Sequence, residues 1–297
     1  MQLGKKEQNL PEVHFEGHSS LNIEVMNFEQ LFDMLNEAQD HDPFAPHKIE
    51  FFLILTVTKH TYTHFIDFTS YELTEGSTLF VAKNQVHYFD RRLQDADGYG
   101  IVFNHLFVNQ HYFLTDNLRL NRLFNYHIES PVIHQKEMGG DSLIEQITFL
   151  HEEHYLENTF AKSEILASLL RVVLLKAERA KQLQALSHIN SYWLETFGNF
   201  KETLEREYAN TRNSRFYASQ LFVSYKFLND VVKRLSGKTV KAFIDDFVII
   251  EIKRNLISTS LSVNEISYLT GFEEPSNMIK FFKKHTQTTP LRFRQQL

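Results

Sequence analysis

With 297 residues, the chain is long enough for about two domains, and its 42% hydrophobic and 23% charged residues exclude extended disorder. The absence of cysteine excludes disulfide scaffolds, thiolate zinc sites and cysteine nucleophiles, and makes the reducing cytoplasm the expected compartment. The formal net charge is -6, and the chain has neither a signal-peptide core nor an apolar run of about 20 residues, so we expect no secretion and no membrane partner.

The first predicted domain, residues 1–135, is a small β structure. From residue 49 onward, short apolar or alternating segments rich in β-branched and aromatic residues predict strands: IEFFLILTV, THFIDF, STLFV, VHYF and YGIVFNHLF. Turn sequences such as Glu75-Gly76-Ser77 separate them at the spacing of an antiparallel sandwich or barrel. Residues 71–89, YELTEGSTLFVAKNQVHYF, resemble the hairpin of cupin-like sensor domains, which implies a ligand-sensing β-barrel.

Histidine is concentrated in the first 200 residues, which hold 14 of the 15. His60 and His64 are spaced to share one face of a strand and His87 opens a later strand, so three imidazoles could converge. Metal-binding cupins, however, resemble one another in a His-x-His pair followed by glutamate, and this chain has no such pair. We therefore expect no metal, no cofactor and no catalytic residue. Tyr62, His64 and His87 are candidate contacts for a small-molecule effector.

Helical periodicity replaces strand alternation in residues 136–205, as in SLIEQITFLHEEHYLE and AKSEILASLLRVVLLKAERAKQLQAL. In the second stretch, two neighbouring stripes recur at steps of three and four: Ile165, Leu169, Val172, Val173 and Lys176, and Leu166, Leu170 and Leu174. This apolar face is wider than a lone surface helix needs. Two interpretations stay open, packing against the barrel and a homodimer interface.

The C-terminal segment, residues 206–297, contains an internal repeat at a period of 50, seen when residues 228–239 are laid over 278–289. Each copy predicts a short helix, a tight turn and a second helix, over 216–222 and 225–235 and again over 263–270 and 275–285. The local signals agree. They are the capping box of Ser262 and Glu265, Gly271 for a left-handed turn position, Pro275 for a first helical turn and Ser224 for a helix cap.

Charge is divided unevenly between the two parts of the chain. Residues 201–297 hold 16 Lys and Arg against 10 Asp and Glu, a net charge of +6, whereas residues 1–200 hold 15 against 27, a net charge of -12. A compact basic unit is typical of polyanion binders, although an ordinary solvated surface would give the same count.

Six sequence islands follow one another in the last 80 or so residues. They are Tyr217-Ala218-x-x-Leu221-x-x-Ser224-x-x-x-Leu228, Lys233-x-x-x-Gly237-Lys238-Thr239, Ser262-Val263-x-Glu265-Ile266, Gly271-Phe272-x-x-x-Ser276, Phe281-Phe282-Lys283-Lys284 and Thr289-Pro290-x-x-Phe293-Arg294. In this order they resemble the DNA-binding domain of AraC-type transcriptional regulators. The resemblance implies a variable N-terminal sensing and dimerising domain ahead of this module, with promoter DNA and RNA polymerase as partners.

The resemblance also implies that the second helix of each unit enters the major groove. Candidate base contacts on these helices are Lys226, Asn229, Asp230, Ser276, Ile279 and Lys280. Candidate contacts to the DNA backbone are Ser224, Lys233, Lys238, Lys283, Lys284 and Arg294. The helical spacing predicts that five other residues lie in the core: Leu228, Val232, Phe272, Met278 and Phe282.

Three residues depart from the family pattern. Asp230 stands where arginine is common, and its carboxylate would repel phosphate or accept a hydrogen bond from a cytosine amino group. Gln287 replaces the glycine that the first copy keeps as Gly237, and Phe222 occupies a turn position that a small residue often fills.

Helical spacing through Phe243, Phe247, Ile250 and Arg254 predicts a connecting helix over 240–258, a rod of roughly 25 Å. The predicted fold class is therefore α+β. It comprises a cupin-like β-barrel (1–135), a helical linker that could dimerise (136–205) and an all-α domain with two helix-turn-helix units joined by a long helix (206–297). We expect a homodimeric, sequence-specific, ligand-responsive transcriptional regulator. The alternative is a cupin-type metal-dependent enzyme whose C-terminal helices serve as an interaction module.

Overall fold

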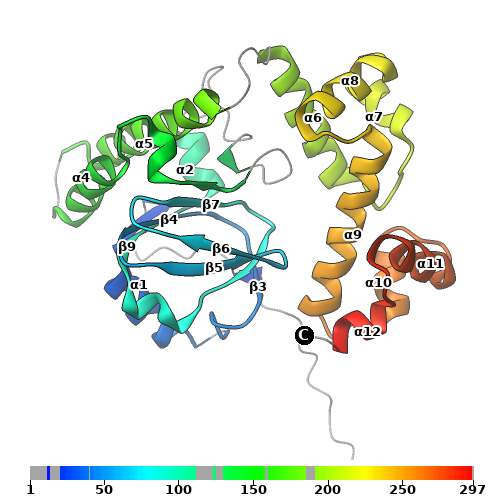
Figure 1. Cartoon of the computed structure of the whole chain (residues 1–297), viewed down its shortest axis with the longest axis horizontal. Helices are drawn as coiled ribbons and strands as arrows, with labels where there is room; N and C mark the ends of the chain where they lie inside the picture. Colours follow the sequence, from blue (N-terminus) through cyan, green and yellow to red (C-terminus); the bar gives the residue numbers. More distant parts are fainter. Residues whose placement is uncertain are drawn as a thin grey trace, which may run out of the picture. The chain divides into compact units, whose positions relative to one another are not determined.

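The computed structural model describes residues 12–13, 21–39, 41–111, 123–124, 130–157, 160–184 and 191–295. The chain divides into two compact units, which we call the N-terminal unit (Pro11–Ser187) and the C-terminal unit (from His188 to Leu297). The N-terminal unit carries the β-sheets and the C-terminal unit is helical (Figure 1). The predicted order of a β-rich part followed by a helical part is thus confirmed.

The described strands form two five-stranded sheets rather than one closed barrel. The first sheet has the order β1-β3-β8-β5-β6, and the second has the order β10-β7-β4-β9-β2. Pairing is antiparallel except between β1 and β3. The bounds are β1 Glu12–Val13, β2 Ile23–Asn27, β3 His47–Ile49, β4 Phe52–Lys59, β5 Tyr62–Ile66, β6 Thr69–Leu73, β7 Thr78–Val81, β8 Val86–Tyr88, β9 Asp97–Phe103 and β10 Val132–Ile133.

Strand β4 is buried on both faces, which explains its unbroken apolar sequence. Leu53 and Leu55 belong to the core between the two sheets, together with Ile66 of β5. Ile54 points the other way, into a second core that lies under helices. The last predicted strand was too long, because β9 ends at Phe103 and the side chain of Asn104 caps a helix, α2 (His105–Gln110).

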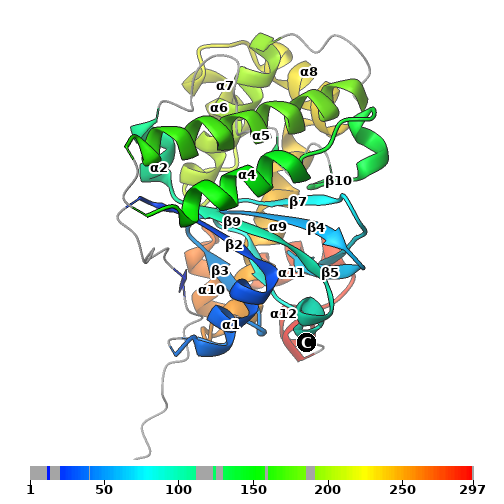
Figure 2. The same ribbon diagram turned by 90° about the vertical axis from the view of Figure 1, so that its left-hand side faces the viewer.

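Helices α4 (Ile144–Tyr155) and α5 (Lys162–Gln184) cover the outer face of the second sheet (Figure 2). One stripe of α5, Leu166, Leu170 and Leu174, is buried in this core with Ile54. The ammonium of Lys181 is buried as well and donates to the carbonyls of Ser130 at 2.6 Å and Val132 at 3.1 Å. In the other predicted stripe, Val173 is buried as well and Leu169 and Lys176 are partly buried. The residues of α5 that stay exposed are Ile165, Val172 and Leu175, at 38%, 41% and 37%, and we call them the exposed stripe. Packing against the sheet therefore accounts for most of the wide apolar face.

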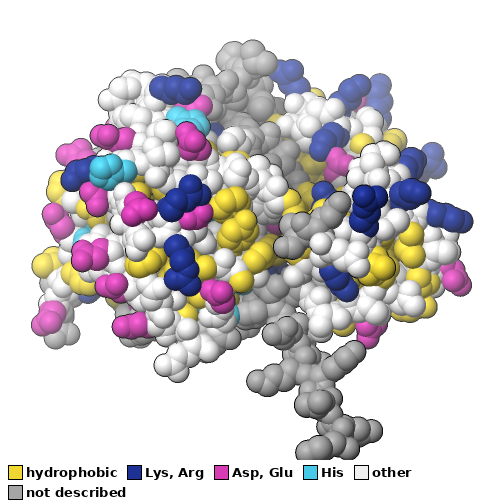
Figure 3. Space-filling view, turned by 60° about the horizontal axis from the view of Figure 1, so that its bottom comes forward, with side chains coloured by type: hydrophobic (Ala, Val, Ile, Leu, Met, Phe, Trp, Pro, Cys, Tyr) yellow, Lys and Arg dark blue, Asp and Glu magenta, His cyan; other side chains and the backbone are white. Residues whose placement is uncertain are grey.

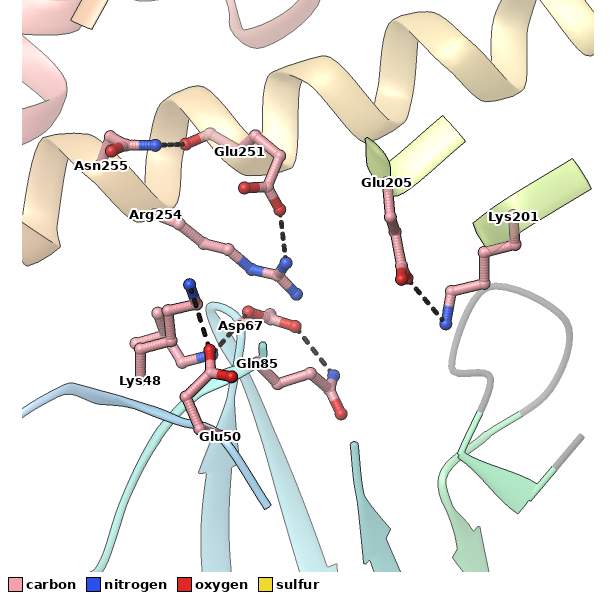
Figure 4. A network of polar contacts seen from close by, with 10 residues as sticks. Lys48, Glu50, Asp67, Gln85, Lys201, Glu205, Glu251, Arg254 and Asn255 are labelled. Atoms are coloured by element: carbon pink, nitrogen blue, oxygen red, sulfur yellow. Dashed lines mark hydrogen bonds and ion pairs between the residues drawn. The ribbon is translucent and has the colours of Figure 1, made fainter. Parts of the chain in front are cut away.

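Shorter elements complete the N-terminal unit. They are α1 (Phe28–Glu37), η1 (Arg91–Asp95) and η2 (Gln135–Met138). The β5–β6 turn is held to β8 by Asp67, which accepts from the Gln85 side-chain amide at 2.8 Å and from the Val86 backbone at 3.2 Å (Figure 4). Strands β2 and β6 and helix α1 were not predicted. Within the described ranges, no helix is both long enough and apolar enough to cross a membrane.

The C-terminal unit is built on α9 (Val240–Ser258), which has the bounds that the sequence predicts. Helices α6 (Ser191–Glu207), α7 (Ser214–Gln220) and α8 (Tyr225–Ser236) pack along one part of α9. Helices α10 (Val263–Leu269), α11 (Pro275–Thr286) and α12 (Pro290–Gln295) pack along the other (Figure 1). On α9 itself, the buried guanidinium of Arg254 contacts Glu251 at 2.5 Å (Figure 4).

Candidate nucleic-acid interface

The two predicted helix-turn-helix units are present, α7 with α8 and α10 with α11. The first helices begin 49 residues apart, at Ser214 and Val263, whereas the second helices begin 50 residues apart, at Tyr225 and Pro275. The period of 50 therefore holds for the second helices, and the turn of the second unit contains one additional residue.

The two turns begin with the same backbone geometry. The N–H of Phe222 donates to the Ser219 carbonyl at 3.1 Å, and the N–H of Gly271 donates to the Tyr268 carbonyl at 3.0 Å. Both residues have left-handed backbone angles, with φ of 55° at Phe222 and 77° at Gly271. Phe222 thus occupies in the first helix-turn-helix unit the position that Gly271 has in the second. A residue with a β-carbon is less stable than glycine in this left-handed conformation. The side chain of Phe222 is 97% exposed.

The helix ends are capped as the sequence predicts. Ser224 accepts from the N–H of Phe227 at 3.1 Å, and Ser262 forms a capping box with Glu265. Pro275 lies at the start of α11. At the helix C-termini, Gly237 and its counterpart Gln287 both adopt left-handed φ, 72° and 60°. The departure at Gln287 is therefore accommodated without changing the turn.

The candidate base-reading residues differ in their surroundings. Lys226, Asp230, Ser276 and Lys280 are exposed on α8 and α11, and Ile279 is partly buried. Asn229 is also partly buried, and its side-chain oxygen accepts from the N–H of Val240 at 3.2 Å, at the first residue of α9. Asn229 therefore helps to hold α8 against α9, a role that the sequence did not indicate. The five predicted core residues, Leu228, Val232, Phe272, Met278 and Phe282, are all buried, which confirms that part of the prediction.

The candidate backbone contacts fall into two groups. Lys233, Lys283 and Lys284 are exposed in the last turns of α8 and α11. Lys238 instead pairs with Asp246 at 2.6 Å, and the Arg294 Nε donates to the Leu256 carbonyl at 2.7 Å, which anchors α12 to the end of α9. On the face that Figure 3 shows, Lys and Arg side chains gather over the C-terminal unit, and Asp and Glu are frequent over the N-terminal unit.

A buried histidine cluster lies in the first sheet of the N-terminal unit. His64 and His87 are 0% and 1% exposed, and the His64 Nε2 is 3.0 Å from the His87 Nδ1. The His87 ring also contacts that of His47 on β3, with centroids 4.4 Å apart. The expectation for His60 was wrong, because it lies in the β4–β5 turn with φ of 66° and is exposed. His47 was missed, since its spacing in the sequence gives no sign that β3 pairs with β8.

A chain of polar contacts runs through this cluster. The Asp90 N–H donates to the Tyr62 oxygen at 3.1 Å, and the Tyr62 oxygen lies 3.2 Å from the His64 Nδ1. Burial raises the pKa of Tyr62, so the phenol keeps its proton. One nitrogen of the His64–His87 contact donates and the other accepts, because a neutral imidazole carries a single proton. The chain ends at the His87 Nε2, a buried atom that has no hydrogen-bond partner among the described residues.

Burial keeps the imidazoles of His64 and His87 neutral. Burial, followed by the charge of His47, lowers the pKa of His64 to about 3. Burial also lowers the pKa of His87 well below its ordinary value, and the neighbouring imidazoles lower it further. In the part of the chain that the structure describes, no group of three or more His, Asp or Glu is arranged to hold a metal ion.

The comparisons with known proteins concern both units. The helix-turn-helix domain family matches residues 217–296. The chain is similar to the HTH-type transcriptional activator RhaS of Escherichia coli O1:K1 / APEC, with 23% identity over 265 residues that cover 85% of this chain and 88% of RhaS.

Two solved structures are also similar. ToxT from Vibrio cholerae is 12% identical, with 93% of this chain and 98% of ToxT covered and a TM-score of 0.43. The C-terminal domain of the response regulator yesN from Fusobacterium nucleatum is 25% identical, with 32% of this chain and 93% of that domain covered and a TM-score of 0.30.

The matched domain family covers both helix-turn-helix units, and the similarity to RhaS extends into the N-terminal unit. The alternative of a cupin-type enzyme finds no support in this similarity, because RhaS is a transcriptional activator. The order of sequence islands is confirmed as the signal of a helix-turn-helix domain, and the similarity to RhaS agrees with the expectation of a DNA-binding transcriptional regulator of the AraC type.

Proposed function

We propose that this protein is a homodimeric, effector-responsive transcriptional regulator that reads promoter DNA with α8 and α11. The observation that carries the proposal is the pair of equivalent, capped helix-turn-helix units on a single helix, α9. Its 19 residues give a length of about 28 Å. A helix of this length suits two recognition helices that enter successive major-groove segments about 34 Å apart. Such a chain would act in the cytoplasm of a bacterium, together with RNA polymerase, and the relation to RhaS favours activation.

Within this proposal, base readout belongs to the exposed side chains of the two helices. On α11, the proposed base-reading side chains are Ser276 and Lys280, with Ile279 as an apolar contact. On α8, they are Lys226 and Asp230. Lys233, Lys283 and Lys284 are the proposed phosphate contacts, because they are exposed. Ser224 and Arg294 have partners within the chain, so their contribution to DNA binding would be through the fold.

The salt dependence of DNA affinity distinguishes the proposed base contacts from the proposed phosphate contacts. We expect Lys280→Ala to cost about 1–3 kcal/mol on the preferred site and little on random DNA, because it removes a base contact. We expect Lys283→Ala to weaken both DNAs and to reduce the slope of log affinity against log salt by roughly one, because it removes a phosphate contact. Fluorescence anisotropy titrations of both DNAs at several salt concentrations measure these effects. Equal losses on both DNAs for Lys280→Ala would remove it from base readout.

The exposed stripe of α5 is the proposed dimer surface. Besides Ile165, Val172 and Leu175, Phe149 on the neighbouring α4 and Leu156, the residue after this helix, are exposed, at 50% and 49%. Exposed apolar side chains mark interaction surfaces on soluble proteins when they form a contiguous patch. A symmetric dimer would double the number of DNA segments that one complex reads.

Charge placed in this stripe tests the dimer. Val172→Asp should shift the protein from dimer to monomer and weaken binding to a double site by at least about tenfold, because a carboxylate would be desolvated in the interface. Ser70→Asp, at an exposed position on β6, adds the same charge away from the stripe and should change neither property. Analytical ultracentrifugation measures the association state. A wild-type chain that is monomeric at micromolar concentration would refute the proposed dimer.

The effector site is the part of the proposal that involves Tyr62, His64 and His87. The chain of contacts from Asp90 to His87 leaves one polar atom, the Nε2 of His87, without a partner among the described residues. A buried polar atom is costly when it is unpaired. A small molecule with a hydroxyl group can donate to this nitrogen or accept from it, which makes hydroxyl-bearing compounds the chemical class to screen first.

A further inference from the structure

A short segment between α6 and α7 contacts both helix-turn-helix units, and we call residues 209–213 the bridge segment. Toward the first unit, the hydroxyl of buried Tyr217 on α7 donates to the Thr211 carbonyl at 2.7 Å. Toward the second unit, the Ala209 carbonyl lies so close to Gly271 that a β-carbon on this glycine would overlap it. The bridge segment therefore touches the turn that precedes α11.

Arg212 makes the most extensive of these contacts. Its Nη2 donates to the Thr270 carbonyl at 2.7 Å, at the end of α10. Its guanidinium carbon lies 3.6 Å from the ring centroid of Phe272 and 5.5 Å from that of Phe281 on α11. A planar guanidinium can stack on an aromatic face and donate within its own plane, so one side chain holds both the turn and the helix after it. Burial lowers the pKa of Arg212, as expected for a cation placed against two rings.

These contacts give the two helix-turn-helix units a second connection besides α9. The length of α9 sets the separation of the two helix-turn-helix units, whereas their rotation about α9 also depends on how the helices of each unit pack against it. The bridge segment connects α7 of the first helix-turn-helix unit with the turn of the second helix-turn-helix unit. Such a closed connection fixes the separation and the rotation of α8 relative to α11.

We propose that Arg212 is a positioning residue for DNA reading, and that it makes the protein selective for one spacing between the two major-groove segments bound by a single chain. The inference rests on the proposed reading of DNA by both α8 and α11. Arg212 touches the turn and not the DNA in this proposal, so its effect is on which spacing is accepted and not on which bases are preferred.

Spacing variants of one operator test the proposal. The preferred site is first selected from random DNA with the full-length wild-type chain, and one base pair is then inserted between its two protected segments. The insertion moves the second segment by about 3.4 Å and turns it by roughly 35°. We expect wild type to bind the inserted site at least about tenfold more weakly, as for the loss of a good base contact. Arg212→Ala should show a penalty of about threefold or less.

Two further variants make the experiment specific. Phe272→Leu keeps a buried apolar side chain but removes the ring under the guanidinium, and it should relax the spacing in the same direction. It also serves if Arg212→Ala does not fold, which thermal unfolding will show. Arg215→Ala removes an equal charge from an exposed position on α7 and should keep the wild-type penalty.

The outcomes separate this inference from the function on which it rests. A wild-type protein that protects a single segment, or that ignores the insertion, would refute the reading of DNA by two helices. A wild-type protein that is sensitive to the insertion, with folded Arg212→Ala and Phe272→Leu variants that keep the full penalty, would refute the positioning role alone. A penalty that falls in both variants and not in Arg215→Ala supports it.

Discussion

Replacing Gly271 with alanine is expected to destabilise the C-terminal unit by about 3 kcal/mol or more. Two costs add at this position. The backbone has φ of 77°, which costs an L-residue roughly 1–2 kcal/mol. The new β-carbon would also overlap the Ala209 carbonyl, which is backbone and cannot rotate away, so the bridge segment must shift. Urea unfolding of the full chain, followed by the fluorescence of Trp193 on α6, measures the loss.

Gly237→Ala is the matched control for this change. Gly237 has a similar φ of 72°, but a β-carbon there would meet nothing within 4 Å. It should therefore cost only about 1–2 kcal/mol, the backbone part of the effect. Equal losses for the two variants would show that the close approach of Ala209 has no energetic weight. Such a result would also weaken the case for the bridge segment.

Acid is expected to destabilise the N-terminal unit through the buried histidine cluster. The pKa of His64 is about 3 in the folded chain, against an ordinary value of 6.5, so between these pH values the unfolded chain binds a proton that the folded chain does not. Stability is therefore full above pH 6.5 and falls as the pH is lowered toward 3. The loss is about 1.4 kcal/mol per pH unit for one histidine, or roughly 2 kcal/mol at pH 5. His87 adds to the loss in the same direction.

The difference between variants isolates this contribution from that of the carboxylates. A His64→Leu/His87→Leu double variant should lose less stability between pH 7 and pH 5 than wild type, because neither buried group can then take up a proton on unfolding. His105→Gln removes an exposed histidine of α2 and should keep the wild-type dependence. Chemical unfolding at each pH, monitored by circular dichroism, gives the free energies. Parallel curves for wild type and the double variant would contradict the assignment of the cluster.

The sequence by itself determined the C-terminal architecture to within a few residues. Caps, left-handed glycine positions and helical periodicity are local signals, because each acts within one or two turns of the chain. They located α8, α9 and α11, and the capping box at Ser262 and Glu265 located the start of α10. The ordered islands then indicated a DNA-binding domain, and the helix-turn-helix domain family that matches residues 217–296 confirmed it.

Only the tertiary structure decided the features that depend on contacts between distant segments. Whether the strands closed into a barrel depended on edge pairing, and they formed two sheets. His47 joined His87 because β3 pairs with β8, and His60 left the cluster because its backbone turns. Asn229 and Arg212 found their partners 11 and 58 residues away, at Val240 and Thr270. No local pattern encodes such partners, because packing of whole elements sets them, and the bridge between the two DNA-reading units is one of them.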